Sequence, residues 1–284
     1  MDGLKAKLQW RKLARLFTRP VVAAMARNGS AQPLWAALRV AGVVPEKGAP
    51  LSSLLNECLQ ALHRNYRCEY VYKAAIGDRV VFGRHSPRTA SLHVEQHVGD
   101  SIVDLAVFNG TSTAYEIKTE FDSDRRLVSQ ASNYLKTFEQ VYLVTHPGLA
   151  ERYLRVAHPD VGVLALNARG SLTTVRAAIT GIERLDKAAL FRMLRAAEFQ
   201  AAVRRLCGPQ PEVPNVEVRA HYGQLWATLS IEQAHRAYVS AMQARTTQPA
   251  VADFVSALPS SMRVLGYATP LSAVQRQRIL NIFH

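Results

Sequence analysis

Residues 101–120 read SIVDLAVFNGTSTAYEIKTE, and this stretch predicts a β-hairpin. Both of its halves are rich in β-branched and aromatic side chains, which favour strands. Asn109-Gly110 stands between the halves, and this dipeptide is a strong signal for a hairpin turn. Because side chains alternate along a strand, Glu116 and Lys118 share one face of the second strand. The rest of the chain can be placed around this hairpin.

The position of Asp104 on the first strand depends on the length of the turn. A turn with an odd number of residues, such as residues 109–111, places Asp104 directly opposite Glu116, whereas an even number turns it to the other face. In the odd register two carboxylates lie side by side. At about 4 Å they repel each other by about 4 kcal/mol at an effective dielectric of about 20. Such a pair needs a proton, a neighbouring cation or a bound metal ion.

Carboxylates that remain partly open suit Mg²⁺ or Mn²⁺, because these ions keep several waters and bind the phosphate oxygens of a substrate. Lys118 lies on the same face, where it would orient or activate the attacking water and offset the charge that builds on the phosphate. We therefore expect metal-assisted hydrolysis of a phosphodiester bond, with Asp104 and Glu116 as metal ligands and Lys118 as a catalytic residue.

The spacing of these residues, Asp104 followed after eleven residues by Glu116-Ile117-Lys118, resembles the motif of the PD-(D/E)XK nuclease superfamily. Pro usually precedes the Asp in that superfamily, whereas this chain has Val103. The resemblance implies that the Asp and the Glu-x-Lys lie on adjacent strands of a small sheet between helices. It also implies a metal-dependent nuclease.

The sequence after the hairpin extends the resemblance. Gln130 and Tyr134 lie four residues apart in a predicted helix, residues 125–138, so they share a helical face. They resemble the Q-x-x-x-Y element of RecB-like members, which implies that they support the site or contact the substrate backbone. With strands predicted over residues 92–98 and 140–145, the order helix, strand, strand, strand, helix, strand matches the superfamily core.

The expected fold is therefore α/β (α+β), with a restriction-endonuclease-like αβββαβ core and a mixed sheet. We divide the chain into a basic helical N-terminal region, residues 1–48, a PD-(D/E)XK nuclease-like domain, residues 49–180, and a helical C-terminal region, residues 181–284. A second hairpin, predicted over residues 161–177, would extend the sheet of the nuclease-like domain.

A third carboxylate is expected upstream of the hairpin. The stretches EYVYK, GRHS and YEIKTE, which begin at residues 69, 83 and 115, resemble a group of bacterial nuclease-like proteins that are mostly uncharacterised. In the superfamily an early helical acid often becomes a further metal ligand, and this implies a catalytic and metal-binding role for Glu69. Glu57 is the alternative, and a solvated surface side chain is an equally open interpretation of either residue.

Four more residues are expected near the site. Arg84 and His85 belong to a polar, basic loop predicted over residues 78–90 and would contact a phosphate, although a plain surface loop is the other interpretation. Glu120 lies one pleat beyond the Glu-x-Lys and is predicted to support the site or to contact DNA. Glu95 would border the metal site from the strand before the hairpin.

The net charge of +13 lies mainly outside the nuclease-like domain. Residues 1–50 carry nine Lys or Arg against two acids, residues 51–180 carry fourteen against thirteen, and residues 181–284 carry twelve against seven. Basic flanks suit an enzyme that acts on nucleic acid, because phosphates must be drawn towards carboxylates that repel them. The expected partner is nucleic acid, with DNA favoured over RNA. Solubility or nonspecific adhesion to polyanions is the plainer interpretation of the charge.

Cysteine usage and hydropathy bear on the compartment. Cys58, Cys68 and Cys207 are odd in number and lack metal-ligand spacing, which favours a reducing environment over a disulfide scaffold. No apolar run reaches the roughly 18 residues of a membrane span, so we expect a cytoplasmic protein without a membrane partner. The oligomeric state stays open, with a homodimer possible.

Three hypotheses follow. The leading one is a Mg²⁺-dependent nuclease, a hydrolase that cuts phosphodiester bonds with a metal-activated water. The alternative is a catalytically inactive protein of nuclease fold that binds nucleic acid or regulates another process. The third is a transcription regulator that reads DNA through helices in residues 1–50.

Overall fold

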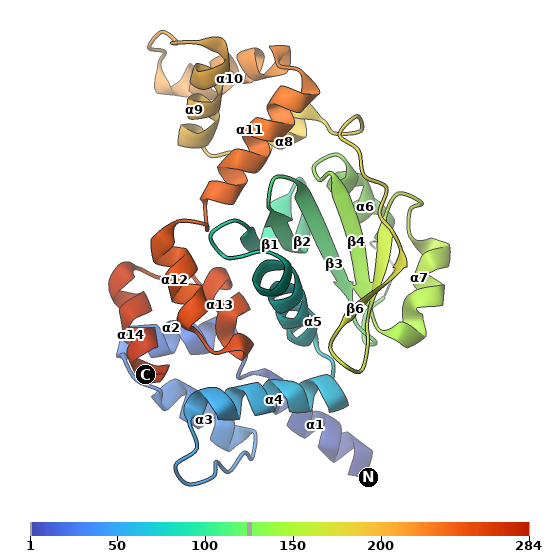
Figure 1. Ribbon diagram of the computed structural model, residues 1–284, viewed down its shortest axis with the longest axis vertical. Coiled ribbons are helices and arrows are strands. Elements are labelled where there is room, and N and C mark those ends of the chain that lie inside the picture. Colours follow the sequence, from blue (N-terminus) through green and yellow to red (C-terminus); the bar gives the residue numbers. More distant parts are fainter. Residues whose placement is uncertain (1, 124–126, 284) are drawn as a thin grey trace.

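A computed structural model describes residues 2–123 and 127–283 and has the mixed α/β architecture expected from the sequence (Figure 1). One sheet contains six strands in the order of the chain: β1 (Ser91–Val98), β2 (Ser101–Phe108), β3 (Ser112–Lys118), β4 (Gln140–Thr145), β5 (Gly162–Leu166) and β6 (Leu172–Arg176). Pairing is antiparallel from β1 to β3 and between β5 and β6, and it is parallel from β3 to β5. Both predicted hairpins and the mixed sheet are confirmed.

The helices of the core follow the predicted order. Before the sheet, the chain forms α1 (Asp2–Ala14), α2 (Arg19–Asn28), α3 (Gln32–Val40), α4 (Leu51–Asn65) and α5 (Glu69–Ile76). The parallel strands are connected by α6 (Leu127–Leu135), a 3₁₀ turn η2 (Pro147–Leu149) and α7 (Ala150–Val156). One prediction is wrong. The start of the loop expected over residues 78–90 is a π-helix, η1 (Gly77–Arg84), because Val80 and Val81 turn inward and are buried.

The C-terminal part is helical, as predicted. They are α8 (Lys187–Met193), α9 (Ala196–Cys207), α10 (Asn215–Thr228), α11 (Ile231–Ala244), α12 (Pro249–Ala257), a 3₁₀ turn η3 (Ser260–Met262), α13 (Arg263–Ala268) and α14 (Ala273–Phe283). Ser230 separates α10 from α11, because its hydroxyl accepts a hydrogen bond from the backbone N–H of Gln233 and so starts α11.

The two faces of the sheet are covered by different helices (Figure 1). One face packs against α5, and its cluster also contains side chains of α1–α4 and α12–α14. The other face packs against α6, and its cluster continues into α8–α11. The three regions predicted from the sequence therefore do not correspond to three separate cores, since the first cluster contains residues from all of them.

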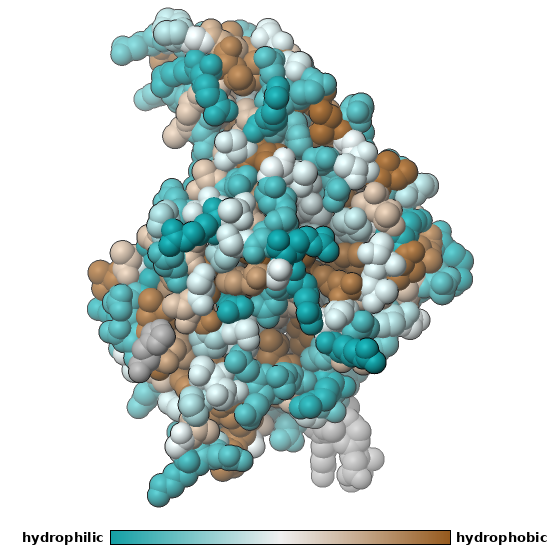
Figure 2. Space-filling view, viewed as in Figure 1, coloured by the Kyte–Doolittle hydropathy of each residue, from teal (hydrophilic) through white to brown (hydrophobic). Residues whose placement is uncertain are grey.

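The face of the molecule in Figure 2 is mostly hydrophilic, and its hydrophobic residues appear in small separate groups. Within residues 2–123 and 127–283, no helix combines the length and the apolar character that crossing a membrane requires.

Candidate active site

The turn between β2 and β3 has the odd register, so Asp104 and Glu116 lie on opposing positions of the two strands. Leu105 lies opposite Tyr115 in the last regular pair, and extending this register by one residue places Asp104 opposite Glu116. The backbones are not paired beyond Leu105 and Tyr115. Instead, Asp104 Oδ2 accepts a hydrogen bond of 2.7 Å from the backbone N–H of Ile117. The first acid of the motif therefore reaches the backbone of β3 and lies close enough to Glu116 to feel its charge.

Glu116 and Lys118 form the centre of the site. Lys118 Nζ donates to Glu116 Oε1 at 2.7 Å and to Gln130 Oε1 at 3.3 Å. The Tyr134 hydroxyl lies 3.0 Å from Glu116 Oε2 and 2.7 Å from the carbonyl oxygen of Ile102, and it can donate its one proton to either. Gln130 Nε2 donates to this hydroxyl at 3.4 Å. The Q-x-x-x-Y pair of α6 thus forms hydrogen bonds with both the Glu and the Lys of the motif.

These charged side chains are buried, since only 5% of Glu116 and 9% of Lys118 is exposed. Burial, together with the negative charges of Glu116 and Glu69, raises the pKa of Asp104 to about 7, against the opposing effects of the Ile117 N–H and Lys73. Ionisation of Asp104 is therefore unfavourable beside Glu116 and Glu69, although Glu116 itself is paired with Lys118. Added positive charge would be bound favourably here.

Glu69 lies close enough to act on Asp104, but its carboxylate is engaged elsewhere. Its Oε1 forms an ion pair of 2.5 Å with Lys73 Nζ, and about half of the Glu69 side chain, 53%, is exposed. Among the described residues no three His, Cys, Asp or Glu side chains form a group that could hold a metal ion. The structure thus places Glu69 beside the site without making it the third member of a three-acid metal centre.

Lys73 is a buried cation that the sequence analysis missed as a site residue. Only 5% of it is exposed, and besides Glu69 its ammonium contacts Glu95 Oε1 at 3.1 Å. Burial lowers the pKa of Lys73, but Glu69, Asp104 and Glu95 outweigh that effect and the pKa is raised. Lys73 therefore stays charged and places a second ammonium near Asp104. Its place in the EYVYK stretch, four residues after Glu69, is the sequence feature that could have indicated this role.

Glu95 has an unusual backbone. Its φ of 52° makes it the one non-glycine residue of the described chain in the left-handed region. The β1–β2 register places it opposite Asp104, between two regular pairs. Its Oε2 accepts from Arg19 at 2.9 Å, so ion pairs with Lys73 and Arg19 lower the pKa of Glu95 although burial opposes them. Such strain clusters at functional sites, and no local sequence pattern predicts it.

Three other predicted site residues lie outside this cluster. Glu120 follows the end of β3, where its Oε1 lies 3.8 Å from His146 Nδ1. His85 Nε2 lies 2.5 Å from Asn109 Nδ2 at the hairpin turn, at the other end of the strands from the acids. Arg84 precedes His85 and ends η1. The structure therefore does not bring Arg84 and His85 to the acids, because the end of η1 places them beside the hairpin turn.

Comparison with known proteins identifies a phage family. A family model described as Bacteriophage P4 protein cII matches residues 63–262, which include every strand of the sheet. Protein cII of Enterobacteria phage P4 is 37% identical over 68 residues, which are 24% of this chain and 26% of that protein. No solved structure matches significantly. Because the family model covers more than half of the sequence, the chain belongs to the Bacteriophage P4 protein cII family.

Proposed function

We propose that this protein is a Mg²⁺-dependent nuclease that hydrolyses phosphodiester bonds, with DNA as the favoured substrate. The observation that carries the proposal is that Asp104 accepts a hydrogen bond from the backbone of Ile117, the residue between Glu116 and Lys118, while Glu116 and Lys118 form an ion pair. The net charge of +13 supports a polyanionic substrate. The name of the family states no activity, so the proposal rests on the site.

The donor set suits a divalent cation. Mg²⁺ is commonly held by one or two carboxylates, with waters and substrate phosphate oxygens in its other positions. Asp104 and Glu116 are two such carboxylates: Glu116 is buried and paired with Lys118, whereas no ion pair of Asp104 is seen among the described residues. A third carboxylate is therefore not required, and Mn²⁺ would use the same oxygens. When bound, the ion would polarise the phosphate and lower the pKa of a coordinated water.

The side chains around the acids have separate roles in this proposal. Lys118 Nζ holds a positive charge in a buried place, where it would orient the attacking water and offset charge on the phosphate. Gln130 and Tyr134 are positioning residues, because their hydrogen bonds hold Lys118 and Glu116. The backbone N–H of Ile117 holds Asp104 in the same way.

Cleavage assays test the proposal directly. Linear and plasmid DNA, single-stranded DNA and RNA would be incubated with the protein in Mg²⁺, with EDTA as the metal-free control. We expect Asp104→Asn and Lys118→Met each to lower the rate of cleavage by roughly 100-fold or more. Asp253→Asn and Lys136→Met are matched controls on exposed positions and should cleave like the wild type.

Two outcomes would contradict the proposal in different ways. If the wild type binds nucleic acid but shows no metal-dependent cleavage, the alternative of a nuclease fold that binds or regulates without turnover is favoured. If Asp104→Asn cleaves like Asp253→Asn, the activity belongs to another site or to another protein in the preparation.

A further inference from the structure

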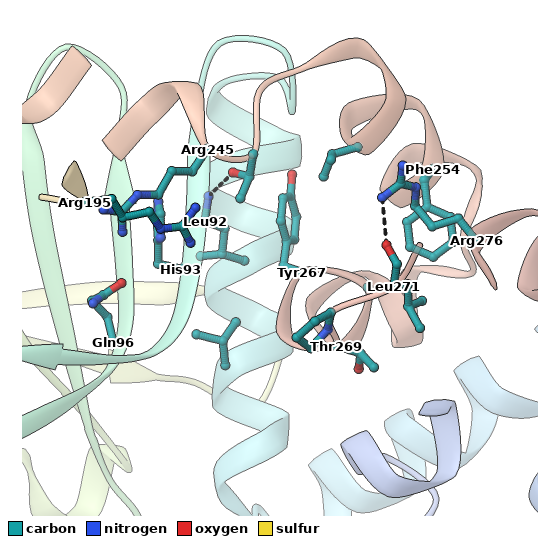
Figure 3. Close-up of a pocket in the computed structure, with 15 residues that line it drawn as sticks. Leu92, His93, Gln96, Arg195, Arg245, Phe254, Tyr267, Thr269, Leu271 and Arg276 are labelled. Carbon is teal, nitrogen blue, oxygen red and sulfur yellow. Dashed lines mark hydrogen bonds between the residues drawn. The ribbon is translucent and has the colours of Figure 1, made fainter. Parts of the chain in front are cut away.

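A cavity of about 340 Å³ lies between the outer edge of β1 and the C-terminal helices (Figure 3). The 15 residues that line it come from β1, from the segment before α9, from the end of α11 and from residues 251–276. None of these 15 residues is acidic, and three of them are Arg195, Arg245 and Arg276. Asp104 and Glu116 are not among them, so the cavity is distinct from the candidate active site.

Positive charge exceeds negative charge around the cavity. Arg245 is compensated by Glu198, whose two carboxylate oxygens accept hydrogen bonds of 2.7 and 2.6 Å from its guanidinium. Arg195 and Arg276 have no ion pair within the part of the chain that the structure describes. Burial and, to a smaller extent, the positive charges of Arg245 and Arg195 lower the pKa of His93 to about 4, so its imidazole is neutral near pH 7. Three arginines therefore stand beside one carboxylate, Glu198, whose pKa is lowered by both Arg245 and Arg195.

The wall of the cavity also contains hydroxyl groups that lack a partner. Tyr267 OH and Thr269 Oγ1 are both buried and make no hydrogen bond, and only 6% of Thr269 is exposed. Buried polar atoms of this kind nearly always have a partner, which a bound molecule can supply. In Figure 3, Tyr267 stands between Arg195 and Arg245 on one side and Arg276 on the other. Two residues with unpartnered hydroxyls and three arginines thus line the cavity.

We propose that this cavity binds the phosphate group of a nucleotide. Arg195 and Arg276 supply charge-assisted donors, and the hydroxyls of Thr269 and Tyr267 supply neutral ones. Apolar side chains of β1 and α12 also line the space and suit the sugar and base. Ligand pockets span roughly 300–1,000 Å³, so a cavity of about 340 Å³ matches one nucleotide unit, either free or within a strand. The inference does not depend on cleavage, since it concerns binding at another site.

Binding of a free nucleotide is tested by calorimetry in EDTA with dAMP and with inorganic phosphate. Binding of a strand is tested by fluorescence anisotropy with a labelled single-stranded oligonucleotide. Arg276→Gln is expected to weaken binding about tenfold or more, because a charged hydrogen bond is lost. Arg278→Gln is the matched control, since Arg278 lies on the same helix and, like Arg276, donates to a backbone carbonyl. Thr269→Val should fold normally, because its hydroxyl has no partner to lose, yet weaken binding several-fold.

Each outcome either supports or overturns the proposed phosphate-binding site. Weaker dAMP binding in Arg276→Gln and Thr269→Val, with Arg278→Gln unchanged, would identify a site for a free nucleotide. If dAMP does not bind, but Arg276→Gln weakens oligonucleotide binding and lowers its salt slope by about 1, the site holds a phosphate of the strand. If both variants match Arg278→Gln with dAMP and with the oligonucleotide, the inference is wrong, whatever the cleavage assays show.

Discussion

Replacing Asp104 by Asn should make the metal-free protein more stable at alkaline pH. The folded protein raises the pKa of Asp104 from an ordinary value of 3.8 to about 7, chiefly through burial and through Glu116. An acid whose pKa is higher in the folded state binds its proton more tightly there, so its ionisation destabilises the fold. Stability is therefore lost as pH rises from about 4 through 7. Asn cannot ionise, and its oxygen can still accept from the Ile117 N–H.

The size of the effect follows from the same two values. Each pKa unit corresponds to about 1.4 kcal/mol, so the change from 3.8 to about 7 sets a limit of about 4 kcal/mol. We expect Asp104→Asn to exceed the wild type by about 2–4 kcal/mol in free energy of unfolding at pH 8. The advantage should fall to near zero at pH 4, where the wild-type carboxyl is protonated.

Urea unfolding in EDTA at pH values from 4 to 8 measures this difference. The comparison of the two proteins cancels the titrating groups that do not interact with Asp104, and Asp253→Asn controls for the loss of an exposed carboxylate. A stability difference that stays constant across this pH range would refute the reasoning, because Asp104 would then ionise equally in the folded and unfolded chains.

Three further predictions can be measured by the same unfolding assay. Mg²⁺ at 100 times its dissociation constant should stabilise the wild type by about 2.7 kcal/mol and should not stabilise Asp104→Asn; equal responses would exclude Asp104 as a ligand. Glu95→Val should be less stable than Glu95→Gly by about 1–2 kcal/mol, because only Gly accepts a φ of 52° without strain; equal stabilities would show that this backbone is relaxed. Because burial lowers the pKa of His93 from 6.5 to about 4, the wild type should lose up to about 3 kcal/mol relative to His93→Gln as pH falls from 6.5 to 4. A loss of the same size in His93→Gln would assign that acid sensitivity to other groups.

Local patterns were sufficient for much of the fold and for the centre of the candidate site. The β-branched and aromatic residues on both sides of Asn109-Gly110 predict the hairpin, and the shared face of Glu116 and Lys118 follows from the pleat alone. The four-residue spacing of Gln130 and Tyr134 predicts that both reach the same point. These are relations between residues that are near in the chain, where backbone geometry leaves few arrangements open.

Local patterns do not predict three other features of the site: the parity of the turn, the left-handed backbone of Glu95 and the partners of Lys73. Lys73 and Glu95 lie on different elements, and Arg19 reaches Glu95 from the N-terminal region. The cavity lined by Arg195 and Arg276 is likewise enclosed by β1 and by helices near the C-terminus. Short-range periodicity specifies which face of an element is apolar, whereas contacts between distant segments depend on how those faces pack together. That packing minimises the free energy of the whole chain, and no single stretch of sequence contains it.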